Sequence, residues 1–172
     1  MATTTAAGRP RPRKISLVPD AYDRLLSVVA LVLLAAVLAA LWRGRREWAA
    51  VPPFVWLHIA TIVVAVALTP VMLLRRRGDR LHRRLGWLWV GAMALTAAFS
   101  FAIREMMDGE LGPIHVLSAL TILTLPLIVC SARSHRHRAH RSAVRGLVTG
   151  ALVVAGLFTF PFGRLLGRWL FG

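Results

Sequence analysis

Four histidines stand at corresponding places along the chain, each close to the start of a long apolar stretch. His58 and His115 lie just inside two of these stretches, whereas His82 and His140 immediately precede two others. Successive helices of a bundle run antiparallel, so His58 and His115 should share one end and His82 and His140 the other. Two facing histidines are what a bis-histidine haem requires. The spacing therefore predicts two haem b groups, with all four histidines as iron ligands, carrying electrons across a membrane.

The apolar stretches that must position these histidines are each about as long as a membrane-spanning helix, which needs about 20 apolar residues. At 1.5 Å of rise per residue, the two histidine pairs should lie roughly 24 Å apart. We therefore predict an all-α fold, a polytopic integral membrane helix bundle of about five transmembrane helices, formed as a single domain by residues 21–172. The predicted spans are residues 22–42, 53–74, 85–103, 113–132 and 143–163.

The composition supports a membrane protein and not a soluble domain. The chain of 172 residues is 57% hydrophobic, with a mean hydropathy of +0.63, yet its net charge is +15. The charge comes mostly from arginines beside the apolar stretches, where they act as topology determinants and meet anionic lipid headgroups. It is therefore not a signal of nucleic-acid binding. Residues 1–20, rich in Thr, Ala, Arg and Pro, should form a disordered basic tail.

The distribution of arginine also predicts the orientation. Basic residues gather in the tail, in segment 75–84 and in segment 133–141, which all lie on one side of a chain with five spans. That side should be cytoplasmic. A short basic run at residues 43–46 argues weakly for the opposite orientation. The acidic residues between the third and fourth spans should lie outside; they are Glu105, Asp108 and Glu110.

A simpler interpretation competes at each histidine. His58 and His115 would then be interfacial residues hydrogen-bonded to a carbonyl group or water, and His82 and His140 would belong to solvated basic loops. The neighbouring arginines are compatible with both interpretations. They favour a neutral imidazole through charge repulsion, and they could pair with haem propionates.

Other chemistry has less support in the sequence. There is no Gly-rich phosphate loop and no Ser-His-Asp arrangement, so at most the chain is an electron-transfer component of an oxidoreductase. Cys130 is the only cysteine, which excludes an internal disulfide and a Cys-based metal cluster. His135, His137 and His140 offer an alternative Zn²⁺ or Cu site in the basic segment.

Several short motifs resemble a bacterial family of predicted membrane proteins, catalogued as domain of unknown function twenty-three-oh-six. The likeness extends from about Trp56 to the C-terminus and implies a multi-pass protein of the bacterial cytoplasmic (inner) membrane, without an established activity. The histidine pattern separately resembles the ascorbate-type di-haem transmembrane cytochromes b, in which four core helices each contribute one histidine. The motifs of the family likeness are His82-Arg-Arg-Leu-Gly86, Gly112-Pro-Ile-His115, His140-Arg141, Ala-Gly-Leu-Phe-Thr-Phe at 155–160 and Gly-Arg-Leu-Leu at 163–166.

Three functions follow as hypotheses. The first is a b-type haem protein for transmembrane electron transfer. The second is a non-enzymatic structural or accessory protein that binds anionic lipid or a partner subunit, and the third is a small transporter or metal-handling protein. The expected partners are the lipid bilayer with anionic headgroups, an electron donor or acceptor, a partner subunit, and further copies of the chain in a homo-oligomer.

Overall fold

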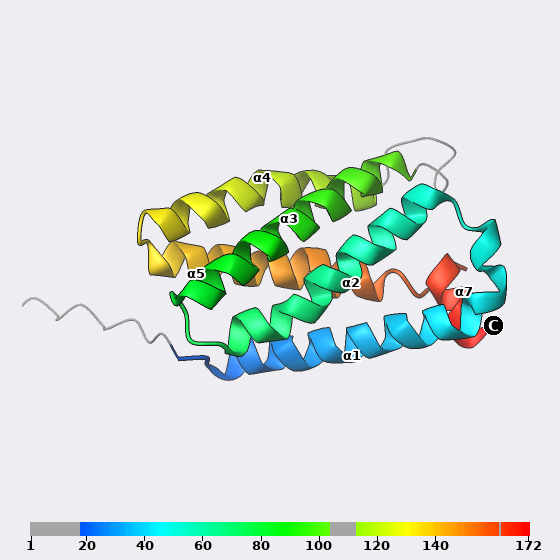
Figure 1. Cartoon of the computed structure of the whole chain (residues 1–172), viewed down its shortest axis with the longest axis horizontal. Helices are drawn as coiled ribbons and strands as arrows, with labels where there is room; N and C mark the ends of the chain where they lie inside the picture. Colours follow the sequence, from blue (N-terminus) through cyan, green and yellow to red (C-terminus); the bar gives the residue numbers. More distant parts are fainter. Residues whose placement is uncertain (1–17, 104–112, 162) are drawn as a thin grey trace, which may run out of the picture.

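The computed structural model describes residues 18–103, 113–161 and 163–172, and this part of the chain contains helices but no strand (Figure 1). The long helices lie side by side, and successive ones run in opposite directions. The predicted all-α helix bundle is thus confirmed. The elements are α1 (Ala21–Arg43), the 3-10 helix η1 (Gly44–Ala50), α2 (Pro53–Leu74), α3 (Arg80–Ala102), α4 (Pro113–Arg133), α5 (His137–Leu147), the π-helix η2 (Val148–Val154), α6 (Ala155–Leu157) and α7 (Leu165–Phe171).

The helices begin where the local sequence can satisfy the free N–H groups of a first turn. Asp20 and Asp23 form a capping box at α1, in which each side chain accepts a hydrogen bond from the backbone N–H of the other. Asp79 caps α3 by accepting a hydrogen bond from the backbone N–H of His82. Helix α2 begins at Pro53, because proline is tolerated in a first turn where its missing N–H has no intrahelical acceptor.

Two helices begin earlier than the apolar stretches that predict them. Helix α3 begins at Arg80 and not at residue 85, and α5 begins at His137 and not at residue 143. His82 and His140 therefore lie in first turns of helices and do not precede them. An apolar stretch marks the length that contacts lipid, whereas the helix itself continues into polar sequence until its cap.

The last predicted span also differs from the structure at its other end. The backbone stays right-handed and helical through α5, η2 and α6, that is, over residues 137–157. It then turns, and the short helix α7 folds back against α1. Gly44 makes this contact possible, because a Cβ at that position would overlap the Trp169 ring.

The outer surface of the bundle exposes many large apolar side chains, and the interior includes several polar ones. Large side chains such as Val116, Leu123 and Val32 are 71%, 70% and 64% exposed, whereas Asp23 and Thr69 are buried. Four helices of the described residues are long and apolar enough to cross a membrane, a pattern expected of a membrane protein. They cover Ala21–Ala50, Pro53–Leu74, Arg80–Ala102 and His115–Arg133.

Each helix packs on the next, and the ring closes where η2 contacts both α1 and α4. The interior of this ring holds the cavities described below. The predicted tail, apart from residues 18–20, and the predicted outer segment with Glu105, Asp108 and Glu110 lie outside the described residues.

Candidate functional site

The antiparallel arrangement separates the histidines into two pairs, as the spacing predicts. Helices α1, α3 and α5 begin at the end of the bundle where α2 and α4 finish, which we call the basic end (Figure 1). His82 and His140, in the first turns of α3 and α5, therefore lie at the basic end. His58 and His115, near the starts of α2 and α4, lie towards the opposite end.

At the basic end, His82 and His140 line one cavity of about 420 Å³. Trp89, Val90 and Ile128 contribute apolar wall, the first two from the middle of α3 and the third from the last third of α4. The structure thus brings together two histidines that are far apart in the sequence, in a cavity with apolar walls.

The two imidazoles of this cavity are held differently. His140 donates its Nδ1–H to the backbone carbonyl of Ile128, over 3.1 Å. Because a carbonyl oxygen only accepts, this bond places the proton on Nδ1 and leaves the Nε2 lone pair for a metal, the usual arrangement in histidine ligation. The Nδ1 atom of His82 is buried and has no hydrogen-bond partner among the described residues, so the ring is not held at that nitrogen.

At the opposite end the histidines do not meet in one cavity. His58 donates Nδ1–H to the carbonyl of Thr96, over 3.0 Å, and lines a second cavity of about 770 Å³. His115 is 5% exposed and is not among the residues that line this cavity. Its ring lies 5.7 Å from that of Phe101, between ring centroids. The simpler interpretation of His58, an interfacial histidine bonded to a carbonyl group, describes its observed contact.

Beside the basic-end cavity lies a group of charges that the sequence analysis does not identify. Asp23 is fully buried, and its carboxylate accepts from Arg77 at 2.6 Å and from Arg141 and Arg145 at 2.8 Å. Asp20 pairs with Arg141 at 2.9 Å and also with Arg145. These residues, the Asp–Arg cluster, join the start of α1 to α5 and to the connection between α2 and α3.

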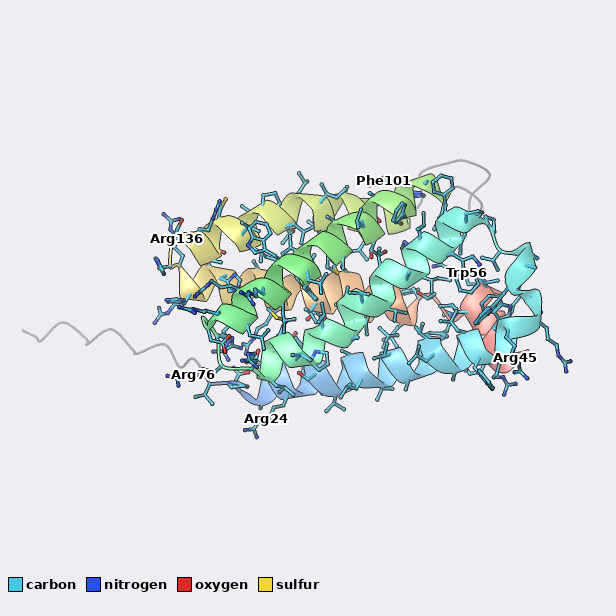
Figure 2. All side chains as sticks on the ribbon, viewed as in Figure 1. Arg24, Arg45, Trp56, Arg76, Phe101 and Arg136 are labelled. Atoms are coloured by element: carbon cyan, nitrogen blue, oxygen red, sulfur yellow. The ribbon has the colours of Figure 1, made fainter. Side chains whose placement is uncertain are left out.

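The cluster corrects the interpretation of the arginines as topology and lipid residues alone. Three of them turn inward, while Arg24, Arg76 and Arg136 point outward at the same end (Figure 2). The hydrogen bond from Arg145 holds the pKa of Asp20 well below its usual range. One signal in the sequence could have identified the cluster. Asp23 is the only acidic residue within the five predicted spans, and an acid in such a segment is a functional candidate by default.

The alternative Zn²⁺ or Cu site gains no support from the described residues. His135 and His137 have ring centroids 6.2 Å apart, and both line the basic-end cavity with His140. Nevertheless, no group of three or more His, Cys, Asp or Glu side chains is arranged to hold a metal ion within the part of the chain described. A bis-histidine haem needs only two protein ligands, so a haem site does not require a group of three such side chains.

The fold and the site together define an all-α membrane protein with a histidine-lined cavity at its basic end. Comparisons of the chain with protein-family models, curated proteins and solved structures found no match. The likeness to domain of unknown function twenty-three-oh-six and to di-haem cytochromes b therefore stays a prediction from the sequence.

Proposed function

We propose that this chain is a b-type haem protein of a membrane, with His82 and His140 as the axial ligands of the iron. One observation carries the proposal: two histidines from α3 and α5 line the same cavity, and one of them has its Nε2 lone pair available. A haem held by His82 and His140 would supply one-electron transfer between a donor and an acceptor.

The cavity has the features of a site for a largely apolar cofactor. Its volume of about 420 Å³ falls in the range of about 300–1,000 Å³ that is typical of ligand sites. Its apolar wall includes Trp89, whose indole N–H is satisfied by the Thr69 hydroxyl at 3.0 Å. This ring therefore offers a hydrophobic surface with no unmet donor.

The second haem, at His58 and His115, rests on weaker support. His58 has the same Nδ1–carbonyl bond as His140, but only His58 of this pair lines the larger cavity. We therefore propose one haem at the basic end. Haem binding by His58 and His115 stays a prediction that the haem stoichiometry tests.

The proposed location is the bacterial cytoplasmic membrane, with the basic end on the cytoplasmic side. The exposed arginines at the basic end support this orientation through the excess of positive charge expected there. The helical run over residues 137–157 supports a fifth crossing, because it is about 30 Å long at 1.5 Å per residue.

A second candidate function is an accessory protein that binds anionic lipid. The outward-pointing Arg24, Arg76 and Arg136 favour it, because they present exposed guanidinium groups at one end of the bundle (Figure 2). This function predicts that Arg76→Gln with Arg136→Gln loses co-purifying anionic lipid, whereas histidine variants keep it. Lipid mass spectrometry of the purified variants measures the difference.

The test of the haem proposal is a reduced-minus-oxidised visible spectrum of the detergent-purified protein expressed with a haem supply. Pyridine haemochromogen quantitation then counts the haem. One haem b per chain is expected, and two would extend the proposal to His58 and His115. A protein without a Soret band would overturn the proposal.

A further inference from the structure

The unmet hydrogen-bonding groups of the structure gather at one place. Among the described residues, three buried side-chain atoms have no hydrogen-bond partner, namely Arg77 Nη1, His82 Nδ1 and Arg141 Nε. The three residues that carry these atoms all line the basic-end cavity. A buried donor without an acceptor costs free energy, so a cavity surrounded by such atoms favours a ligand that supplies acceptors.

The way in which the guanidinium groups are held explains why these donors remain. Arg77 and Arg141 each use Nη2 to bind the carboxylate of Asp23. Their side chains are only 14% and 19% exposed, so water does not freely replace a missing partner. Arg145 differs, because both its Nε and its Nη2 bind Asp23.

The charges of the cluster point to the kind of ligand. Three guanidinium groups share the two carboxylates of Asp20 and Asp23, which leaves an excess positive charge beside the cavity. Residues 1–17 contain no Asp or Glu that could balance it. An anionic oxygen group would both neutralise this charge and accept from the unmet N–H groups.

We propose that Arg77 and Arg141 bind the carboxylates of the ligand of this cavity, which are the propionates if the proposed haem function holds. The inference rests on that function for the identity of the ligand. His82 and His140 would hold the iron, and Arg77 and Arg141 would hold the propionates. The cavity then matches one molecule in three respects, namely imidazole ligands, apolar wall and an anion site.

The test compares two porphyrins on the full-length, haem-free protein in detergent. Iron protoporphyrin IX carries two propionates, and its dimethyl ester is nearly the same size without their charge. The wild type should bind the diacid about ten- to a hundred-fold more tightly, the usual effect of charge-assisted hydrogen bonds. Soret titration measures both dissociation constants, and this comparison needs no variant that could fail to fold.

Substitutions then identify the residues responsible for the tighter binding of the diacid. Arg77→Gln and Arg141→Gln should each bring the two dissociation constants closer together, mainly by weakening the diacid. Arg76→Gln is the matched control, because Arg76 is the exposed neighbour of Arg77 and should keep the full preference. Variants that keep the wild-type preference would overturn the assignment to these two arginines.

The failures are distinguishable. Equal binding of the diacid and the ester by the wild type would overturn the propionate inference and leave the haem function standing. Absence of a saturable shift of the Soret band with either porphyrin would overturn the proposed function itself, and the inference with it.

Discussion

The two ends of the bundle contain the same kind of residue in different surroundings. At the opposite end, the His58 ring is fixed by the Thr96 carbonyl and His115 is buried beside Phe101. At the basic end, His82 and His140 share a cavity in which the described residues leave three buried donor or acceptor atoms unmet. The comparison shows that a histidine near a helix start carries little information by itself. The candidate site is distinguished from a structural contact because two histidines line one cavity and buried atoms beside them lack hydrogen-bond partners.

The ends also differ in how they are stabilised. The basic end joins α1, α5 and the connection between α2 and α3 through the buried carboxylate of Asp23. The opposite end uses the docking of α7, in which the Trp169 indole donates to Glu47 at 2.9 Å and lies against Gly44. Charge therefore dominates one end and aromatic packing the other, and the two can be perturbed separately.

The largest expected effect separates the two histidine pairs. His140→Ala should abolish haem binding at the basic end, because it removes one of only two axial ligands. His58→Ala should leave that haem in place. The ratio of haem to protein in purified samples measures both, and His58→Ala is the control from outside the basic-end cavity. If His140→Ala kept its full haem content, His140 would not be a haem ligand and the two ends would not differ in haem binding.

The next effect concerns the Asp–Arg cluster. Asp23→Asn should destabilise the folded protein by about 3 kcal/mol or more, because it leaves three nearly buried guanidinium groups without their shared carboxylate. Thermal unfolding in detergent measures the loss. Arg75→Gln breaks an exposed pair with Asp79 and should change the melting temperature little. If Asp23→Asn and Arg75→Gln have the same melting temperature, the Asp–Arg cluster does not stabilise the basic end.

A smaller effect is expected at the opposite end. Gly44→Ala should displace Trp169 and loosen α7, at a cost of about 1–3 kcal/mol for an overpacked contact. Haem binding at the basic end should be unaffected. Gly91→Ala is the matched control, since a Cβ at Gly91 meets nothing within 4 Å. Limited proteolysis of the C-terminus reports the loosening, and equal protection in both variants would contradict the docking of α7.

The smallest effect is a dependence on pH. The Arg145 hydrogen bond lowers the pKa of Asp20 below its ordinary value of 3.8. A carboxyl group whose pKa is depressed by folding stabilises the protein above its unfolded value, and this contribution is lost as pH falls below about 4. The melting temperature of the wild type should therefore fall more steeply between pH 5 and pH 3 than that of Asp20→Asn. Parallel curves would show that the pair with Arg145 contributes nothing.

The fold class was predictable because it depends on local properties of the chain. Apolar length, proline at helix starts and the alternation of charged connections indicate antiparallel helices without any knowledge of side-chain contacts. Helix starts were less predictable. The Asp79 cap of α3 and the polar first turns of α3 and α5 extend the helices past the apolar boundary, so His82 and His140 lie inside them.

The candidate site was predictable only in part, for a physical reason. The sequence alone predicts which histidines lie at the same end, since that follows from helix direction. Only the tertiary structure decides that His82 and His140 line one cavity and that His115 does not line the cavity of His58. It also decides which arginines turn inward, because Asp23 and Arg145 are 122 residues apart and meet only when α1 packs beside η2.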